Sequence, residues 1–278
     1  MKTLYAGLCM AALFLAPLPA LACGDAQTPC TIEGGVYHAE APSGEGPHPA
    51  LVFLHGWGGR GAGVLRNRGL VTALTARGYA LLAPQGMPRR PGDEGGSWNT
   101  RQNPGGRDDI AFLAAVARDA AVRFDLDPAR IVLAGFSAGG MMTWRVACSA
   151  PGTFAAYAPI AGVLWRPLPA RCEGPVRLHH THGWSDPVVP LEGRIVGGGI
   201  RQGDVFAGLA LLRTAAGCAT DAPDGFARRG DYQIRRWTGC GAGASLEMAL
   251  HPGGHVIPSG WSALALDWVE RGASQTAE

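Results

Sequence analysis

The chain has 278 residues, of which 47% are hydrophobic and 17% are charged, and its formal net charge is +2. This length and apolar content suffice for one α/β domain with a sizeable core. The charge is close to neutral and the Lys and Arg residues are scattered, which gives no basis for binding nucleic acid or an anionic membrane surface.

The first residues have the features of a secretory signal peptide. Lys2 gives a positive start, residues 4–15 are apolar, and the segment ALA at 20–22 fits a small-x-small cleavage site. The apolar stretch is too short for a membrane span, and no later stretch reaches the roughly 18 apolar residues that a span requires. We therefore expect a signal peptide over residues 1–22 and a single domain over residues 23–278, in a secreted or periplasmic protein.

Buried strands and helices alternate along the first half of the chain. One or two edge strands are expected within 31–41, and continuous apolar runs predict buried strands at 50–54 and 79–83. A helix is expected at 65–76. The segment 87–106 is a long loop rich in Gly, Pro and Arg, and loops of this length are often functional.

The second half repeats the alternation. A strong amphipathic pattern predicts a helix over 108–124, and Asp127-Pro128 is expected to break the chain before the central strand. Further elements are expected as strands at 155–160, 176–180, 232–237 and 246–250 and as helices at 205–216 and 259–271. This alternation predicts a mostly parallel sheet with helices on both faces.

The central strand runs into a Gly-x-Ser-x-Gly motif. Residues 131–140 read IVLAGFSAGG, and a stretch rich in Ala and Met follows. With 42 glycines in the chain, a chance match to this short motif is a real alternative. The apolar strand before the motif and the helix after it are the context of a nucleophile elbow, in which Ser137 would be the nucleophile.

A serine nucleophile needs a base and an acid, which in this type of fold follow in the order Ser, Asp or Glu, His. Asp186 comes just after a predicted strand, and Pro187 stiffens its turn. The plain alternative is a turn aspartate, since Asp-Pro often starts turns. Asp204 and Asp231 are weaker candidates, while Asp108 and Asp109 precede the serine and break the order.

His255 lies on a glycine-rich loop just before the last predicted helix, where the base is expected. His251 competes for the role, but it ends a strand and is followed by proline. The cluster of His179, His180 and His182 suggests a metal site at first sight. Neighbouring strand residues face opposite sides, so only the second and third of these can share a face. We expect packing and hydrogen bonding near the acid rather than a metal ion.

An oxyanion hole would complete the site. One donor is the N–H of Ala138, and the other is expected from the loop after an earlier strand. The loop HGWGG at 55–59 follows such a strand, which makes the N–H of Trp57 the expected donor. The alternative is a glycine turn that merely reverses the chain. The side chains of Trp57, Trp98 and Trp184 lie beside these motifs and are candidates for an aromatic substrate pocket, although Trp98 could equally be a buried side chain that holds the long loop.

Removal of residues 1–22 leaves six cysteines, and an even count in an exported protein suggests three disulfides. The sequence does not fix their pairing. We expect the sequential pairing of 23 with 30, 148 with 172 and 218 with 240, because it closes short loops. Cys23 directly after the cut also suggests a lipoprotein, but Ala20 stands where such signals usually have leucine. There is no C-x-x-C motif, which argues against a zinc site. The cysteines are Cys23, Cys30, Cys148, Cys172, Cys218 and Cys240.

Taken together, these motifs resemble the polyhydroxybutyrate depolymerase family, which overlaps with bacterial feruloyl and acetylxylan esterases. The resemblance is carried by LHGWG (54–58), APQG (83–86), SWN (97–99), RDDIAF (107–112), GFSAGGM (135–141), HGWSDPVVP (182–190) and GGH (253–255). It implies an α/β-hydrolase fold, ester hydrolysis by a triad of Ser137, Asp186 and His255, and the oxyanion roles of Trp57 and Ala138. It also implies the disulfides 148–172 and 218–240. Family members often have an aromatic residue after the catalytic histidine, where this chain has VIP at 256–258.

The expected function is therefore that of a serine carboxylic-ester hydrolase acting on hydroxyalkanoate oligomers or on feruloyl or acetyl esters of plant polysaccharides. No cofactor is implied, and the sequence does not set the oligomeric state. A serine peptidase of the same fold is the first alternative, because a triad alone does not separate esters from amides. The second alternative is a non-catalytic binding protein that kept the fold, against which the complete triad speaks.

Overall fold

We describe the protein from a computed structural model that covers residues 23–241 and 243–275, the last three by their backbone alone. The predicted signal peptide at 1–22 and the last residues of the predicted domain, 276–278, lie outside the described residues. Among the helices described, none combines the length and the hydropathy that a membrane crossing demands.

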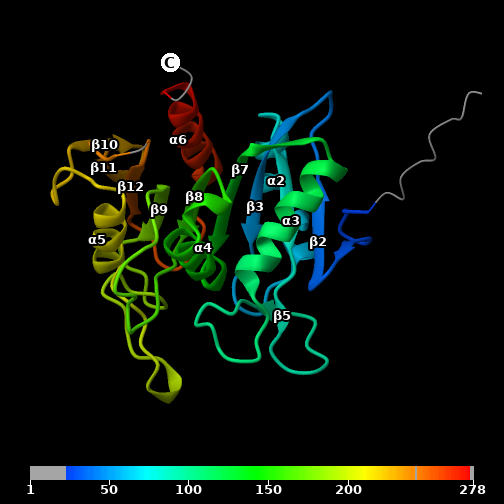
Figure 1. The fold of residues 1–278 in the computed structure, drawn as a ribbon, viewed down its shortest axis with the longest axis horizontal. Coiled ribbons are helices and arrows are strands. Elements are labelled where there is room, and N and C mark those ends of the chain that lie inside the picture. The colour runs from blue at the N-terminus through cyan, green and yellow to red at the C-terminus, as the bar shows by residue number, and fades with distance from the viewer. Residues whose placement is uncertain (1–22, 242, 276–278) are drawn as a thin grey trace, which may run out of the picture.

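One sheet of ten strands runs through the described chain, in the order β1-β2-β4-β3-β7-β8-β9-β12-β11-β10. It crosses Figure 1 from the blue N-terminal strands to the yellow and orange strands β10 to β12. In this order the six central strands, from β4 through β3, β7, β8 and β9 to β12, are parallel. Two antiparallel strands flank them at each end. The strands are β1 (Cys30–Ile32), β2 (Gly35–Glu40), β3 (His48–Leu54), β4 (Ala80–Pro84), β7 (Leu126–Phe136), β8 (Ala156–Ile160), β9 (Arg177–Gly183), β10 (Gly225–Arg229), β11 (Tyr232–Trp237) and β12 (Ser245–His251).

Side chains of the parallel strands alternate between two apolar clusters, one on each face of the sheet. Val52 and Leu133 belong to the first cluster, whereas their chain neighbours Leu51 and Val132 belong to the second. A strand turns successive side chains to opposite faces, so a strand that packs against both clusters is apolar at consecutive positions unless its buried polar side chains are hydrogen-bonded, as they are in β9. This accounts for the continuous apolar runs in the sequence.

Helices cover both faces. Side chains from α3, α4 and α5 join the first cluster, and side chains from α1, α2 and α6 join the second. Figure 1 shows α3 and α4 in front of the sheet. The helices are α1 (Gly61–Arg66), α2 (Arg68–Thr75), α3 (Asp109–Arg123), α4 (Ala138–Ser149), α5 (Val205–Ala215) and α6 (Trp261–Gln275), with short 3₁₀ turns η1 (Pro151–Thr153) and η2 (Gly197–Gly199). This arrangement is the α/β-hydrolase type of fold expected from the sequence.

Some boundaries differ from the prediction. The helix expected at 65–76 is two helices that meet at Asn67, whose side chain accepts the Leu70 N–H and so caps the second helix. At Asp127-Pro128, where a break was expected, β7 continues but its pairing is interrupted: Leu126 pairs with His48 of β3, and the pairing resumes with Ile131 and Ala50. The strand β10 was not predicted. Its side chains are mostly exposed, so it lacks the apolar run on which strand recognition depends.

Three disulfides join the cysteines in sequential order. They link Cys23 with Cys30, Cys148 with Cys172, and Cys218 with Cys240. The first fastens the beginning of the described chain to β1. The other two close segments whose ends are 24 and 22 residues apart, so they restrict the unfolded chain as well as the folded one.

The strand order changes direction at one point of the sheet, between β3 and β7. The chain moves from β3 outward to β4, but from β7 it moves in the other direction to β8, so β3 and β7 are neighbours at the point where the direction changes. Loops that leave the carboxyl ends of such strands diverge and leave room for a ligand. The loop at 55–59 follows β3, and Ser137 follows β7. The long loop at 87–106, which contains the small strands β5 (Met87–Pro88) and β6 (Gly96–Ser97), hangs from the lower edge of the sheet in Figure 1.

Candidate active site

Ser137 lies in a sharp turn between β7 and α4. Its φ of 57° and ψ of −117° fall in a region that costs a side-chain-bearing residue about 1–3 kcal/mol. The turn is possible because glycines pass very close to backbone atoms. A Cβ on Gly139 would lie 2.1 Å from the Leu54 carbonyl oxygen, and one on Gly140 would lie 2.5 Å from the Ile160 carbonyl oxygen. Gly139 and Gly140 are therefore steric requirements of this turn.

The structure brings the hydroxyl of Ser137 to the imidazole of His255. Ser137 Oγ lies 2.9 Å from His255 Nε2, and His255 Nδ1 lies 2.8 Å from Asp186 Oδ2. In the arrangement that fits both contacts, the hydroxyl donates to Nε2 and the ring N–H at Nδ1 donates to the carboxylate. The ring of Phe136 lies 4.8 Å from the His255 ring, centroid to centroid, and packs against it. Three residues from separate loops thus form one connected chain.

Backbone amides hold the carboxylate of Asp186 in place. Its Oδ1 accepts the N–H groups of Val188 and Val189, each at 2.9 Å, and its side chain is fully buried. The loops that carry Asp186 and His255 are also bound to each other. The N–H of Trp184 donates to the His251 carbonyl at 2.7 Å. The position of Asp186 relative to His255 is therefore supported by backbone hydrogen bonds.

The loop at 55–59 lies beside Ser137. A Cβ on Gly56 would come within 3.5 Å of Ser137 Cβ. Gly58 N–H donates to the Gly96 carbonyl and Gly59 N–H to the Gly56 carbonyl, so these two amides are already used. The side chain of Trp57 is 69% exposed and its ring lies 3.9 Å from the guanidinium carbon of Arg89.

His55 and Trp98 fix the shape of this loop. His55 Nδ1–H donates to the Gly56 carbonyl at 2.8 Å, and His55 Nε2 accepts the Gly86 N–H at 3.0 Å. Burial lowers the pKa of His55, which keeps the ring neutral as these two bonds require. Trp98 is only 6% exposed, and its Nε1–H donates to the His55 carbonyl at 2.9 Å. A substrate-contacting role for Trp98 does not fit this burial; the alternative, a buried side chain that holds the long loop, does.

Sequence reasoning missed a buried ion pair that also anchors the long loop. Asp109 is 2% exposed, accepts the N–H of Asn99, and lies 2.6 Å from the Nε of Arg107. The guanidinium of Arg107 reaches on to the carbonyls of Gly34 and Gln85. The only signal in the sequence was that two aspartates stand at the start of a helix, one more than capping needs.

The histidines near β9 divide between the two faces of the sheet. His179 bonds to Glu247 at 3.0 Å, and Trp144 Nε1–H donates to His180 Nδ1 at 3.2 Å on the other face. His180 Nε2 lies 2.9 Å from His182 Nδ1, and His182 Nε2 lies 2.7 Å from the Val189 carbonyl oxygen. The last bond requires a proton on His182 Nε2, so His180 must donate to His182. In this buried row of neutral groups each member donates a hydrogen bond to the next, from Trp144 through His180 and His182 to the Val189 carbonyl. We call it the histidine chain.

The histidine chain ends beside the acid. Val189, whose carbonyl accepts from His182, also donates its N–H to Asp186, and His182 Nε2 lies 3.6 Å from Asp186 Oδ2. Burial is the main cause that lowers the pKa of both His180 and His182, so both rings stay neutral at pH 7. Across residues 23–241 and 243–275, no three His, Cys, Asp or Glu side chains are grouped closely enough to hold a metal ion.

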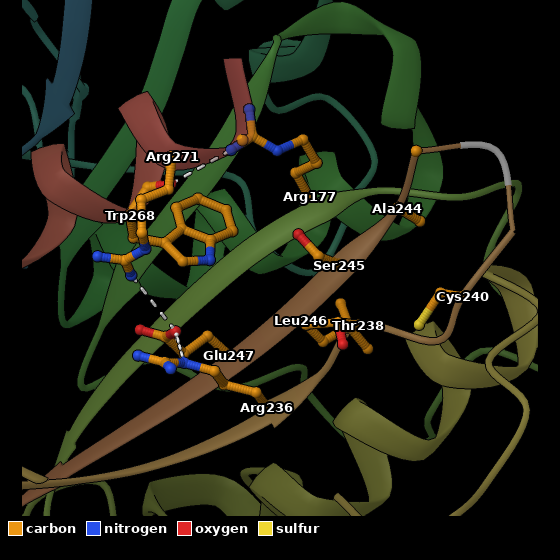
Figure 2. A pocket seen from close by; sticks show the side chains of 12 residues that line it. Arg177, Arg236, Thr238, Cys240, Ala244, Ser245, Leu246, Glu247, Trp268 and Arg271 are labelled. Atoms are coloured by element: carbon orange, nitrogen blue, oxygen red, sulfur yellow. Dashed lines mark hydrogen bonds and ion pairs between the residues drawn. The ribbon is translucent and has the colours of Figure 1, made fainter. Parts of the chain in front are cut away.

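A pocket of about 420 Å³ lies at the other end of β9 and β12, where Arg177 and Ser245 begin these strands. Figure 2 shows Arg236 and Arg271 pointing toward Glu247. Arg236 Nε lies 2.7 Å from the Glu247 carboxylate. Burial by itself would raise the pKa of Glu247, but bonds from His179 and Arg236 outweigh it and leave the pKa below its usual value. The carboxylate in this pocket is thus paired, and the pocket is separate from Ser137.

Comparison with known proteins agrees with the fold. A model of the prolyl oligopeptidase family matches residues 68–165, which include Ser137 but neither Asp186 nor His255. The chain is 34% identical over 154 residues to NocK, a presumed esterase of Nocardia uniformis subsp. tsuyamanensis; the match covers 55% of this chain and 44% of that protein. It is 29% identical over 175 residues to feruloyl esterase C of Emericella nidulans, covering 59% of each chain.

The chain therefore spans about half the length of the curated relatives it matches. Among solved structures, the acetyl xylan esterase from Aspergillus awamori has a TM-score of 0.64 at 16% identity, covering 85% of this chain and 94% of that one. At this identity the likeness concerns the fold. Combined with the ten-stranded sheet and the turn at Ser137, these findings identify the chain as a protein of α/β-hydrolase fold that has esterases among its relatives.

Proposed function

We propose that the protein is a carboxylic-ester hydrolase whose nucleophile is Ser137. The observation that carries this proposal is the contact chain from Ser137 through His255 to Asp186, at 2.9 and 2.8 Å, on a nucleophile elbow. Relatives named as feruloyl and acetylxylan esterases favour an ester rather than an amide as the substrate. The acyl groups of choice are acetyl or feruloyl on a plant polysaccharide, with hydroxyalkanoate oligomers as a further option.

In the proposed reaction each residue carries out one step. His255 Nε2 takes the proton of Ser137 Oγ as the oxygen attacks the ester carbonyl, and Asp186 holds the ring in the tautomer that this transfer needs. The N–H groups of Ala138 and Trp57 bind the developing oxyanion. Ala138 is the first residue of α4, so its N–H has no partner within the helix. His255 then protonates the leaving alcohol, and water hydrolyses the acyl-enzyme.

A serine peptidase is the second candidate, because the prolyl oligopeptidase model matches the segment around Ser137. The match ends before the acid and the base. The triad geometry suits either substrate, so the choice between them requires an experiment.

The domain and compartment follow as parts of the same proposal. One sheet runs through the described chain, which supports a single catalytic domain over residues 23–278. Three disulfides support an oxidising, extracytoplasmic location after removal of residues 1–22.

The test is covalent labelling together with a substrate panel. A fluorophosphonate probe is expected to label Ser137, as located by mass spectrometry of the labelled peptide. The wild type is expected to hydrolyse p-nitrophenyl acetate or methyl ferulate, and Ser137→Ala is expected to lose activity by a factor on the order of a million. Ser43→Ala, an exposed serine in another loop, serves as the control. Failure to label Ser137, or turnover of peptide anilides without turnover of esters, would contradict the proposal.

A further inference from the structure

A second pocket lies beside the loops that carry the acid and the base. We call it the hairpin pocket, because one wall is the hairpin of β10 and β11. Its volume is about 340 Å³. It is lined by Trp184, Arg228, Asp231, Gln233, Leu250, His251 and Pro252.

The hairpin pocket is built from the same backbone as the triad. Trp184 stands two residues before Asp186, and its N–H donates to the carbonyl of His251. The next residue, Ser185, donates its N–H to the Gly253 carbonyl at 3.2 Å and its hydroxyl to the Pro252 carbonyl at 3.1 Å. A group seated in this pocket would therefore lie against the two loops that hold the acid and the base.

The lining combines an aromatic face with polar side chains. Trp184 is 68% exposed, although an indole in a soluble protein is ordinarily well buried. Arg228, Asp231 and Gln233 are exposed on the hairpin and offer both hydrogen-bond donors and acceptors. A sugar ring has a C–H face that packs on an indole and a rim of hydroxyls that both donate and accept. A feruloyl ring would match the indole but would leave most of the polar side chains unused.

His251 adds a buried donor. It is 5% exposed, and its Nδ1 accepts the N–H of Gly253 at 3.1 Å, so the neutral ring carries its proton on Nε2. In the part of the chain that the structure describes, His251 Nε2 has no hydrogen-bond partner. Burial lowers the pKa of His251, which keeps the ring neutral at pH 7. This nitrogen is enclosed by protein atoms, so the polar groups open to a ligand are those of the hairpin side chains.

We propose that the hairpin pocket is a subsite for the sugar ring of a saccharide ester, with Trp184 as the stacking face and the hairpin side chains as hydroxyl partners. This inference rests on the proposed function, since it names the part of the ester substrate that carries the reacting acyl group. It also gives the exposure of Trp184 a cause.

The experiment changes the far wall and leaves the triad loops intact. Gln233→Ala and Asp231→Ala are compared with Phe226→Ala, an exposed residue of the same hairpin that does not line the pocket. Substrates come in pairs with the same acyl group: acetylated xylo-oligosaccharide with p-nitrophenyl acetate, and feruloylated xylo-oligosaccharide with methyl ferulate.

The two pocket variants are expected to raise KM for both oligosaccharide esters about tenfold, as the loss of one or two hydrogen bonds implies, while kcat/KM for the small esters stays within about twofold. The control is expected to match the wild type on all four substrates. Equal losses on both members of a pair, or no loss on either, would overturn the inference. A loss on methyl ferulate with none on the acetylated oligosaccharide would show that the pocket holds an aromatic acyl group instead.

Calorimetric titration with unesterified xylo-oligosaccharide separates the two proposals. Binding that is about tenfold weaker in Gln233→Ala supports the subsite even if no ester is hydrolysed. If the wild type hydrolyses esters but does not bind the sugar, the subsite is wrong and the esterase proposal stands.

Discussion

The histidine chain allows a prediction about stability that separates it from ordinary core packing. Leucine has nearly the volume of histidine, so His182→Leu mainly removes polar atoms. The change leaves the Nε2–H of His180 and the carbonyl of Val189 without partners, and both residues are buried. At about 1–3 kcal/mol for each unpaired buried group, the free energy of unfolding is expected to fall by about 2–6 kcal/mol.

The double variant His180→Leu/His182→Leu gives the decisive comparison. His180→Leu alone also leaves two buried polar groups without a hydrogen-bond partner, Trp144 Nε1–H and His182 Nδ1. The double variant likewise leaves two groups without a hydrogen-bond partner, Trp144 Nε1–H and the Val189 carbonyl. It is therefore expected to be about as destabilised as either single variant, which corresponds to a coupling energy of about 2–6 kcal/mol in the double-mutant cycle.

Urea unfolding followed by circular dichroism measures these free energies by linear extrapolation. His48→Leu is the matched control, because the ring of His48 lies outside the core and bonds to the Gly44 carbonyl at the long distance of 3.3 Å. It is expected to change stability by less than about 0.5 kcal/mol. If the double variant loses the sum of the two single losses to within about 0.5 kcal/mol, the histidine chain is not a coupled unit and the reasoning fails.

Two further predictions concern acid stability and the elbow. Burial lowers the pKa of several histidines below 6.5, so the unfolded chain binds protons that the folded chain does not. These histidines are His55, His180, His182 and His251. The free energy of unfolding should therefore fall as the pH drops below about 6.5, by up to about 1.4 kcal/mol per pH unit for each histidine. The fall should be less steep in the His180→Leu/His182→Leu variant, which lacks two of these histidines. An equal slope in both proteins would refute the conclusion that His180 and His182 are neutral in the folded protein. Gly139→Ala would place Cβ 2.1 Å from the Leu54 carbonyl oxygen, so we expect loss of activity and a lower melting temperature. The control is Gly63→Ala, whose Cβ would have no heavy atom within 4 Å; it should leave activity and melting temperature nearly unchanged or slightly raise stability. Equal behaviour of the two variants would show that the turn at Ser137 tolerates a side chain at position 139.

The sequence alone predicted the fold class and the residues that the structure brings together. The parts of β3 and β7 that pack on both faces of the sheet are continuous apolar runs, so they stand out in the sequence. Ser137, Asp186 and His255 each follow a strand or stand in a loop rich in glycine, where chemistry-bearing residues can be recognised without knowledge of contacts. The partly exposed strand β10 has no continuous apolar run, so neither this strand nor the hairpin pocket beside it could be predicted from the sequence.

Only the tertiary structure decided which residues serve the site indirectly. His180 and His182 were expected to share a face, but the long-range bond from Trp144 to His180 and the burial of the Asp109 carboxylate appear only in the folded chain. The same holds for Trp98, which burial turns from a candidate for substrate contact into the support of the His55 loop. The local residue pattern determines the helices and strands and the turns that end them, because these depend on neighbours along the chain. Burial and pairing depend on which strands become neighbours in the sheet, and that is settled only when the chain has folded.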